Sequence, residues 1–278
     1  MPAAENDPGQ PTPPREPPAA AFFDLDKTVI AKSSTLAFGR SFYSSGLIDR
    51  RAVLKSSYAQ LVFSLAGADA TSMDRMRDAL ALMCRGWDVA QVKQIVEETL
   101  HDLIHPLVYA EAVALIAEHQ QEGRDVVIVS SSGEEVVGPI GELLGVDGVI
   151  ATRMEVADGR YTGQIGFYAY GPYKAEAIRS LAAVRGYDLA SCYAYSDSIT
   201  DLPLLEEVGH PTAVNPDRAL RKVAAERGWP ILNFRWPVRL RDRIARMPVP
   251  TAGAAGIAGA AGIAGAAGLA AVWWRLRR

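Results

Sequence analysis

Residues 20–28 read AAFFDLDKT, and this stretch decides the fold. Its first four residues are apolar, as in a short buried strand, and two carboxylates and a hydroxyl follow where the strand ends. Asp24 and Asp26 would point the same way in an extended chain, but a turn at the end of the strand could give them separate tasks. One acid can then stay ionised as a nucleophile while the other carries a proton.

The rest of the chain alternates between apolar runs and amphipathic stretches. Strands are expected at residues 125–130, at 149–152 leading into a hairpin of 152–156 and 161–165, at 191–196 and, as the last strand before the helix at 216–227, at 211–215. Helices are expected at residues 108–120, 174–185, 202–208 and 216–227. This alternation predicts an α/β fold with a Rossmann-like, mostly parallel sheet and helices on both faces. Such sheets bind ligands beyond the carboxyl ends of their strands.

The segment between the first two strands is expected to be helical. Residues 33–105 show no strand-like alternation, whereas apolar residues recur every three or four positions in 52–65, 73–83 and 89–104. We therefore expect an all-helical insert at 33–105, which leaves residues 20–32 and 106–234 to form the core.

Serines and a lysine follow at places where phosphate groups are commonly bound. Ser130, Ser131 and Ser132 end the second predicted strand, and their hydroxyls, with the amides of the helix that follows, could hold phosphate oxygens. Lys174 opens a predicted helix and offers a point charge for a phosphoryl group. These residues predict an anion site at the edge of the sheet.

A second acidic pair follows the strand at 191–196. Asp197 and Asp201 could supply oxygen ligands to Mg²⁺, which prefers octahedral oxygen coordination with several waters retained. Each polar cluster taken alone is compatible with an ordinary cap, turn or solvated charge. Their order, and their placement at strand ends and helix starts, indicate one site.

Together the four clusters resemble the motifs of the haloacid dehalogenase (HAD) superfamily, in its phosphoserine-phosphatase-like subfamily IB. The resemblance covers residues 20–227 and implies the HAD fold with a helical cap at 33–105. It also implies a Mg²⁺-dependent phosphomonoester hydrolase that acts on a small phosphorylated metabolite through an aspartyl-phosphate intermediate.

The resemblance implies a role for each matching residue. Asp24 would be the nucleophile, and Asp26 the general acid and then the general base. Phosphate would be bound by Thr28, Ser130, Ser131 and Lys174. Mg²⁺ would be held by Asp24, Asp197 and the carbonyl of Asp26, with Asp201 behind these ligands.

Two related classes fit the first motif less well. Dehalogenases of the superfamily lack an acid at the position of Asp26, so this residue favours a phosphatase. The order Asp26-Lys27-Thr28 also resembles the phosphorylated motif of P-type ATPases, but Val29-Ile30 stands where Gly-Thr should follow.

The leaving group is less certain than the phosphoryl chemistry. Phosphoserine phosphatases carry a glutamate soon after the first motif, whereas residues 31–35 read AKSST and contain no acid. Their second motif is typically Ser-Gly-Gly, whereas this chain has Ser130-Ser131-Ser132. Both departures argue against phosphoserine and leave the core chemistry intact, because substrate choice lies in the cap.

Composition narrows the class of protein further. With 49% hydrophobic and 22% charged residues the chain can bury a sizeable core. Its 29 Lys and Arg are balanced by 32 Asp and Glu, which gives no general basis for binding nucleic acid. Cys84 and Cys192 cannot form a disulfide framework, and this suits a reducing compartment. We expect a cytoplasmic protein, whose oligomeric state the sequence leaves open.

The two ends of the chain differ from its middle. Residues 1–19 are rich in proline and lack the apolar run of a signal peptide, so we expect a disordered tail. Residues 235–250 form a basic linker. Residues 251–274 carry no charge, end in Trp273-Trp274 and precede RLRR at the end of the 251–278 segment, which fits an anchor on the cytoplasmic face of a membrane. A flexible low-complexity tail is the alternative.

Two other functions remain open at this level, together with a second metal site. The tail would suit a membrane-associated lipid-phosphate phosphatase, and the fold would suit a regulatory protein that binds a phosphorylated ligand without turnover. The four intact acids argue against the regulatory protein. His101 and His105 lie four residues apart on a predicted helix and could bind a metal ion.

Overall fold

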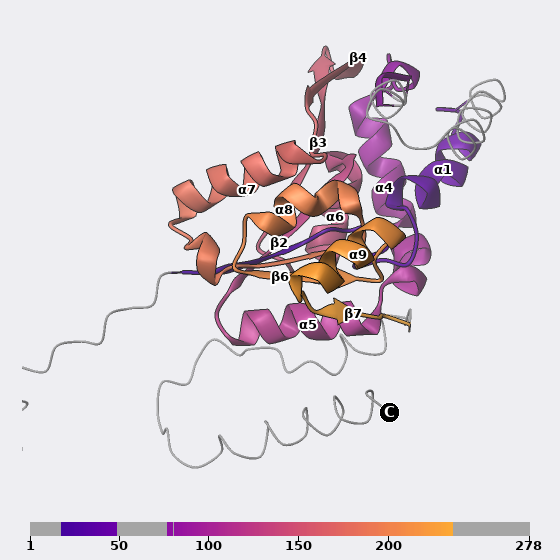
Figure 1. The fold of residues 1–278 in the computed structure, drawn as a ribbon. Helices are drawn as coiled ribbons and strands as arrows, with labels where there is room; N and C mark the ends of the chain where they lie inside the picture. The colour runs from indigo at the N-terminus through magenta and orange to yellow at the C-terminus, as the bar shows by residue number, and fades with distance from the viewer. Residues whose placement is uncertain (1–17, 49–76, 80, 236–278) are drawn as a thin grey trace, which may run out of the picture. The chain divides into compact units, whose positions relative to one another are not determined.

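The computed structural model describes residues 18–48, 77–79 and 81–235, all within the compact unit Met1–Asp242 (Figure 1). These described residues leave out most of the predicted tail at 1–19 (residues 1–17), the helix predicted at 52–65, the basic linker beyond residue 235 and the segment at 251–278. Among the described helices, none combines the length and the hydropathy that a bilayer span requires.

The described residues form a seven-stranded sheet in the order β4-β3-β2-β1-β5-β6-β7. Its strands are β1 Ala20–Phe23, β2 Asp125–Gly133, β3 Gly148–Ala157, β4 Arg160–Phe167, β5 Tyr193–Ser196, β6 His210–Val214 and β7 Ile231–Leu232. Every neighbouring pair is parallel except β3 and β4, which form the hairpin predicted at 152–165. The mostly parallel α/β sheet is therefore confirmed.

β1 lies at the centre of the sheet because its side chains suit burial on both faces. All four of its residues are fully buried. Ala21 and Phe23 pack into one apolar cluster, and Ala20 and Phe22 pack into the other. Successive side chains of a strand point to opposite faces, so a continuous apolar run fits a strand with helices on both sides.

Helices cover both faces of the sheet, as predicted. The core helices are α5 Ala110–Gln121, α6 Glu134–Leu144, α7 Pro172–Arg185, α8 Leu202–Glu206 and α9 Arg218–Arg227. Buried residues of α5 and α6 join the cluster of Phe23, whereas those of α7, α8 and α9 join the cluster of Phe22. Figure 1 shows α7 and α8 on the side of the sheet opposite α5.

The described part of the insert is helical. It contains α1 Ser34–Ser44, helical residues at 77–79 and 81–83, and α4 Val89–Ile104, which matches the range predicted from the apolar spacing. The helix α4 packs against both α1 and α6. The turn of the β3–β4 hairpin lies beside the residues that precede α4, since Val89 N donates to Gly159 O over 3.0 Å.

The chain leaves and rejoins the core at adjacent points. Ala31 N donates to Leu107 O over 2.8 Å, and Tyr109 N donates to Val29 O over 3.0 Å. A short 3-10 turn, η1 His105–Leu107, joins α4 to this crossing. The two connections of the insert are therefore hydrogen-bonded to each other.

One short strand at the end of the sheet was not predicted. β7 follows α9 and pairs in parallel with β6 at Ala213 and Val214. β7 has only two residues, too few to show a periodic pattern.

Candidate functional site

The polar clusters predicted from the sequence meet at one edge of the sheet. β1, β2 and β5 are parallel neighbours, so their carboxyl ends lie side by side. Asp24 directly follows β1, where its amide donates to Tyr195 O over 2.9 Å. Ser130 lies in β2, and Asp197 directly follows β5.

Lys174 joins two of these clusters by ion pairs. Its Nζ lies 2.7 Å from Asp24 Oδ1 and 2.8 Å from Asp201 Oδ2. Ser196 Oγ also donates to Asp201 Oδ2, over 2.8 Å. Lys174 is only 2% exposed, so water does not screen these contacts. The sequence predicted Lys174 beside Asp24 and Asp201 behind them, and the three side chains are in contact.

The site holds more negative than positive charge. Burial alone would lower the pKa of Lys174, but the carboxylates of Asp201 and Asp24 raise it above its ordinary value. Burial raises the pKa of Asp24; Lys174 opposes this shift, and Asp201 adds to it. One ammonium group cannot neutralise two buried carboxylates, so Asp24 favours a proton or a further cation.

Asp197 experiences the same excess of negative charge. Burial raises its pKa to about 6, Lys27 opposes the shift, and Asp201 adds to it. A divalent cation beside Asp24 and Asp197 would reverse both shifts, because it favours the ionised carboxylates.

The donor set fits Mg²⁺ in particular. The described residues contain no group of three or more His, Cys, Asp or Glu side chains placed to hold a metal ion. Two carboxylates with backbone carbonyls and waters are nevertheless the set Mg²⁺ takes, since it retains several waters. The residues present therefore fit the ion that the sequence predicts.

A turn after β1 separates the two acids of the first motif. The carbonyl of Leu25 accepts from the amides of Val29 and Ile30, over 2.9 and 3.0 Å. Lys27 stands in this turn with φ 63°, a left-handed conformation that few residues other than glycine adopt. Asp24 therefore contacts Lys174, whereas Asp26 faces the start of the insert.

Asp26 is held at both carboxylate oxygens. Ser34 N donates to Asp26 Oδ1 over 2.8 Å, and Ser132 Oγ donates to Asp26 Oδ2 over 3.3 Å. Neither serine was predicted to contact the acids. The only sequence signal for Ser132 was its departure from the Ser-Gly-Gly pattern.

The predicted phosphate-binding residues differ in exposure. Ser130 is buried, and its Oγ accepts from Ser132 N over 3.2 Å. Ser131 is exposed, and its carbonyl accepts from Thr152 Oγ1 over 2.8 Å. Thr28 is fully buried, and its Oγ1 has no hydrogen-bond partner within the described part of the chain.

Asp217 holds the loop that carries Asp197, a role that was not predicted from the sequence. Its amide donates to Asp197 O over 2.7 Å. Its Oδ2 accepts from Ile199 N over 2.9 Å, and its Oδ1 accepts from Leu220 N over 2.8 Å, which caps α9. The only signal in the sequence is an aspartate one residue before a helix, which is common to many helices.

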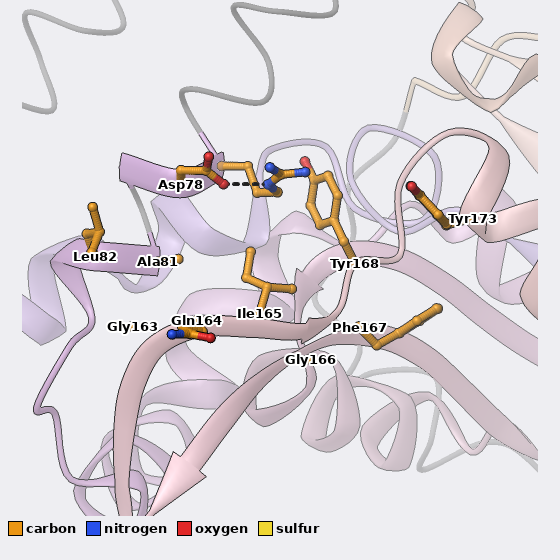
Figure 2. Close-up of a pocket in the computed structure, with 11 residues that line it drawn as sticks. Asp78, Ala81, Leu82, Gly163, Gln164, Ile165, Gly166, Phe167, Tyr168 and Tyr173 are labelled. Atoms are coloured by element: carbon orange, nitrogen blue, oxygen red, sulfur yellow. Dashed lines mark hydrogen bonds and ion pairs between the residues drawn. The ribbon is translucent and has the colours of Figure 1, made fainter.

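A cavity of about 590 Å³ adjoins the loop that leads into Lys174 (Figure 2). It lies between β4 and the helical residues at 77–79 and 81–83, and Tyr168 and Tyr173 line it. The guanidinium of Arg77 lies 5.4 Å from the ring centre of Tyr168. Ala169 N, in this loop, donates to Thr152 Oγ1 over 3.2 Å, and Thr152 Oγ1 donates to Ser131 O. The loop is therefore linked through Thr152 to the serines at the end of β2.

The two histidines that could bind a metal ion contact each other, His101 in α4 and His105 at the start of η1. His101 Nδ1 and His105 Nε2 lie 2.8 Å apart and share a hydrogen bond. They belong to no group of three or more possible metal ligands within the described part of the chain.

The fold and this edge define a class: an α/β enzyme with buried acids and a lysine beyond the carboxyl ends of parallel strands. Residues 21–206 match the family model described as haloacid dehalogenase-like hydrolase. The chain belongs to the haloacid dehalogenase-like hydrolase family, as its four motifs predicted.

Known relatives extend over most of the chain. An inhibition of morphological differentiation protein from Streptomyces azureus is 64% identical over 94% of this chain and 95% of its own length. A probable phosphatase from Mycobacterium tuberculosis is 66% identical over 84% of this chain and 81% of its own. A histidinol-phosphatase from Neisseria meningitidis is 34% identical over 77% of this chain and 98% of its own length. These relatives support a phosphatase.

The fold also matches a solved structure. A protein of unknown function from Bordetella pertussis aligns with a TM-score of 0.70 at 28% identity, over 77% of this chain and 98% of that one. The two proteins therefore share a fold over about three quarters of this chain.

Proposed function

We propose that this phosphatase is a Mg²⁺-dependent phosphomonoester hydrolase that forms an aspartyl phosphate on Asp24. The observation that carries the proposal is the buried ammonium of Lys174 between Asp24 and Asp201, with Asp26 held apart from this group. An acid beside a fixed cation can attack phosphorus while a separate acid serves the leaving group.

The reaction proceeds in two transfers. In the first, Asp24 Oδ forms a bond to phosphorus, the bond from phosphorus to the ester oxygen breaks, and Asp26 gives its proton to that oxygen. In the second, water attacks phosphorus, Asp26 takes a proton from the water, and the bond from phosphorus to Asp24 breaks. The second transfer releases inorganic phosphate and restores both acids.

The remaining polar groups hold the phosphoryl group. Ser130, Ser131 and Thr28 supply donors to its oxygens, and Lys174 offsets the charge that develops on it. Asp24, Asp197 and the Asp26 carbonyl would hold Mg²⁺, which supplies a positive charge against the phosphoryl oxygens.

The leaving group lies in the cavity between β4 and the insert. Tyr168 and Tyr173 give this cavity aromatic surfaces, Tyr173 directly precedes Lys174 in the chain, and Arg77 adds a cation. The histidinol-phosphatase relative supports a small phosphorylated metabolite. We further propose that residues 33–105 act as the cap that closes this cavity and selects the substrate.

Replacing Asp24 by Asn tests the proposal. The amide keeps the size of the side chain but cannot form the acyl phosphate, so turnover of p-nitrophenyl phosphate with Mg²⁺ should fall by at least about 10³-fold. Thermal unfolding should stay cooperative. Acid quenching with labelled substrate should trap a phosphorylated chain in the wild type and not in the variant.

Two results would exclude this function. Mg²⁺-dependent turnover retained by Asp24→Asn would remove Asp24 as the nucleophile. Failure of the purified wild type to hydrolyse any of a panel of phosphorylated metabolites would instead favour a protein that only binds phosphorylated ligands.

A further inference from the structure

A chain of hydroxyl groups joins the start of the insert to Asp26. Ser34 Oγ donates to Ser132 Oγ over 2.8 Å, and Ser132 Oγ donates onward to Asp26 Oδ2 over 3.3 Å. Both serines are buried, with 0% and 6% of their surfaces exposed. Hydrogen bonds in series strengthen one another where water is excluded. The carboxyl group of Asp26 is thus tied to α1 and to β2 at once.

Asp26 also serves α1 in place of its own cap residue. Ser33 is the N-cap of this helix, yet its side chain makes no cap hydrogen bond. The first amides of a helix need acceptors and favour negative charge. Asp26 accepts from the amide of Ser34, the first residue of the helix. The first helix of the insert is therefore capped by Asp26.

Ser132 stands where the Ser-Gly-Gly pattern would put glycine. A glycine has no hydroxyl and could not pass the hydrogen bond from Ser34 to Asp26. The chain of hydroxyl groups therefore depends on Ser132, the residue at which this sequence departs from the pattern.

We propose that Ser132 and Ser34 are positioning residues for Asp26, which fix the orientation of its carboxyl group toward the leaving oxygen. This inference rests on the proposed function, in which Asp26 protonates that oxygen. A general acid works only within hydrogen-bond reach of the atom that it protonates, so freedom to rotate lowers its effect. The serines themselves make and break no covalent bond.

The test compares two esters of similar size whose leaving groups differ in their need for a proton. Phenoxide, from an ordinary phenol with a pKa of about 10, needs protonation far more than p-nitrophenoxide does. We expect Ser132→Gly, Ser132→Ala and Ser34→Ala each to lower kcat/KM for phenyl phosphate by about tenfold. For p-nitrophenyl phosphate the change should stay below about twofold, since its transfer needs little help from an acid.

Two further variants complete the comparison. Asp26→Asn removes the acid altogether and so gives the largest difference in kcat/KM expected between the two esters. Ser44→Ala removes an exposed hydroxyl from the last turn of the same helix and should leave both substrates unchanged. Thermal unfolding of every variant checks that the fold persists.

The outcomes separate this inference from the function on which it rests. If the serine variants lower kcat/KM equally for both esters, or for neither, while Asp26→Asn discriminates between them, the positioning role is wrong. If Asp26→Asn does not discriminate either, the acid role of Asp26 is wrong. If Asp24→Asn retains turnover, the proposed mechanism itself is wrong.

Discussion

Asp217 is a single residue that links the loop carrying Asp197 to the rest of the core. Three hydrogen bonds run from it to the loop of Asp197 and to the first turn of α9. Two of them are accepted by separate oxygens of one carboxylate. A substitution can therefore keep the helix cap and remove the contact with the loop.

We expect Asp217→Asn to weaken Mg²⁺ binding by about tenfold, because it removes the side-chain hydrogen bond that holds the loop two residues after the proposed ligand Asp197. The amide can still cap α9 through one oxygen, but its nitrogen cannot accept from Ile199. The melting temperature without Mg²⁺ should hardly change. Titration of Mg²⁺ against turnover and against melting temperature measures the effect.

Asp188→Asn is the matched control, because Asp188 caps the distant turn η2 Leu189–Ser191 by accepting from Ala190 N. It should leave the Mg²⁺ dependence unchanged. Equal Mg²⁺ titrations for Asp217→Asn and the wild type would show that Asp217 acts only as a helix cap.

The sequence predicted the site residues but not the contacts that support them. Asp24, Lys174 and Asp201 could be brought together because each follows a strand or opens a helix at the same edge. Ser34 and Ser132 could not, since serine is common in loops and at helix starts and nothing in the sequence set these two hydroxyls apart. A hydrogen bond between two such side chains depends on how the folded chain places them, and local sequence patterns do not predict this.

At the scale of elements, α6 shows where local patterns failed. It contains Pro139 together with Gly138 and Gly141, which interrupt the helical pattern, so no range was predicted for it. The two glycines have different surroundings. A Cβ on Gly141 would lie 2.6 Å from Val149 Cγ1, whereas a Cβ on Gly138 would meet nothing within 4 Å. Gly141 therefore allows α6 to approach β3.

We expect Gly141→Ala to destabilise the protein by about 1–3 kcal/mol, because the β-branched side chain of Val149 has little freedom to move away. Gly138→Ala on the same helix should be neutral or stabilise by up to about 1 kcal/mol through helix propensity. Urea unfolding of both variants measures the difference. Equal stabilities would show that the α6–β3 contact relaxes without cost.

Elements with strong periodic patterns were predicted well. α4 matches its predicted range because its buried residues, such as Val92 and Val96, recur on one face. The β3–β4 hairpin followed from its Asp158-Gly159 turn, where both residues have positive φ. β7 was missed because two residues carry no period.

At the scale of the whole molecule, a buried histidine joins α5 to the sheet. Arg124 Nε donates to His119 Nδ1 over 2.7 Å, so the proton of the neutral ring lies on Nε2, which is 2.8 Å from Tyr195 OH. A second proton on the ring would face the guanidinium. Burial, with Arg124 adding to it, lowers the pKa of His119 to about 4.

His119 should make the folded state less stable in acid. The unfolded chain binds a proton near pH 6.5, whereas the folded chain does so only near pH 4, so the unfolded state holds more protons between these values. Stability should fall as the pH decreases through this window, by about 3 kcal/mol in total. Urea unfolding from pH 7.5 to 4.5 measures the slope.

His119→Gln should flatten that slope, and His210→Gln, which changes an exposed ring on β6, should not. If the wild type and His119→Gln lose stability in parallel as the pH falls, other groups account for the acid sensitivity.

The crossing at Ala31 and Leu107 has a consequence for how such proteins diversify. The two points at which the chain leaves and rejoins the core are hydrogen-bonded to each other. The insert can therefore change in length without separating these two points. If the insert selects the substrate, as proposed above, a lineage can change the compounds that it accepts by replacing the insert. The first helix of the replacement must present a backbone amide to Asp26, as Ser34 does, and this requirement limits which segments can be exchanged.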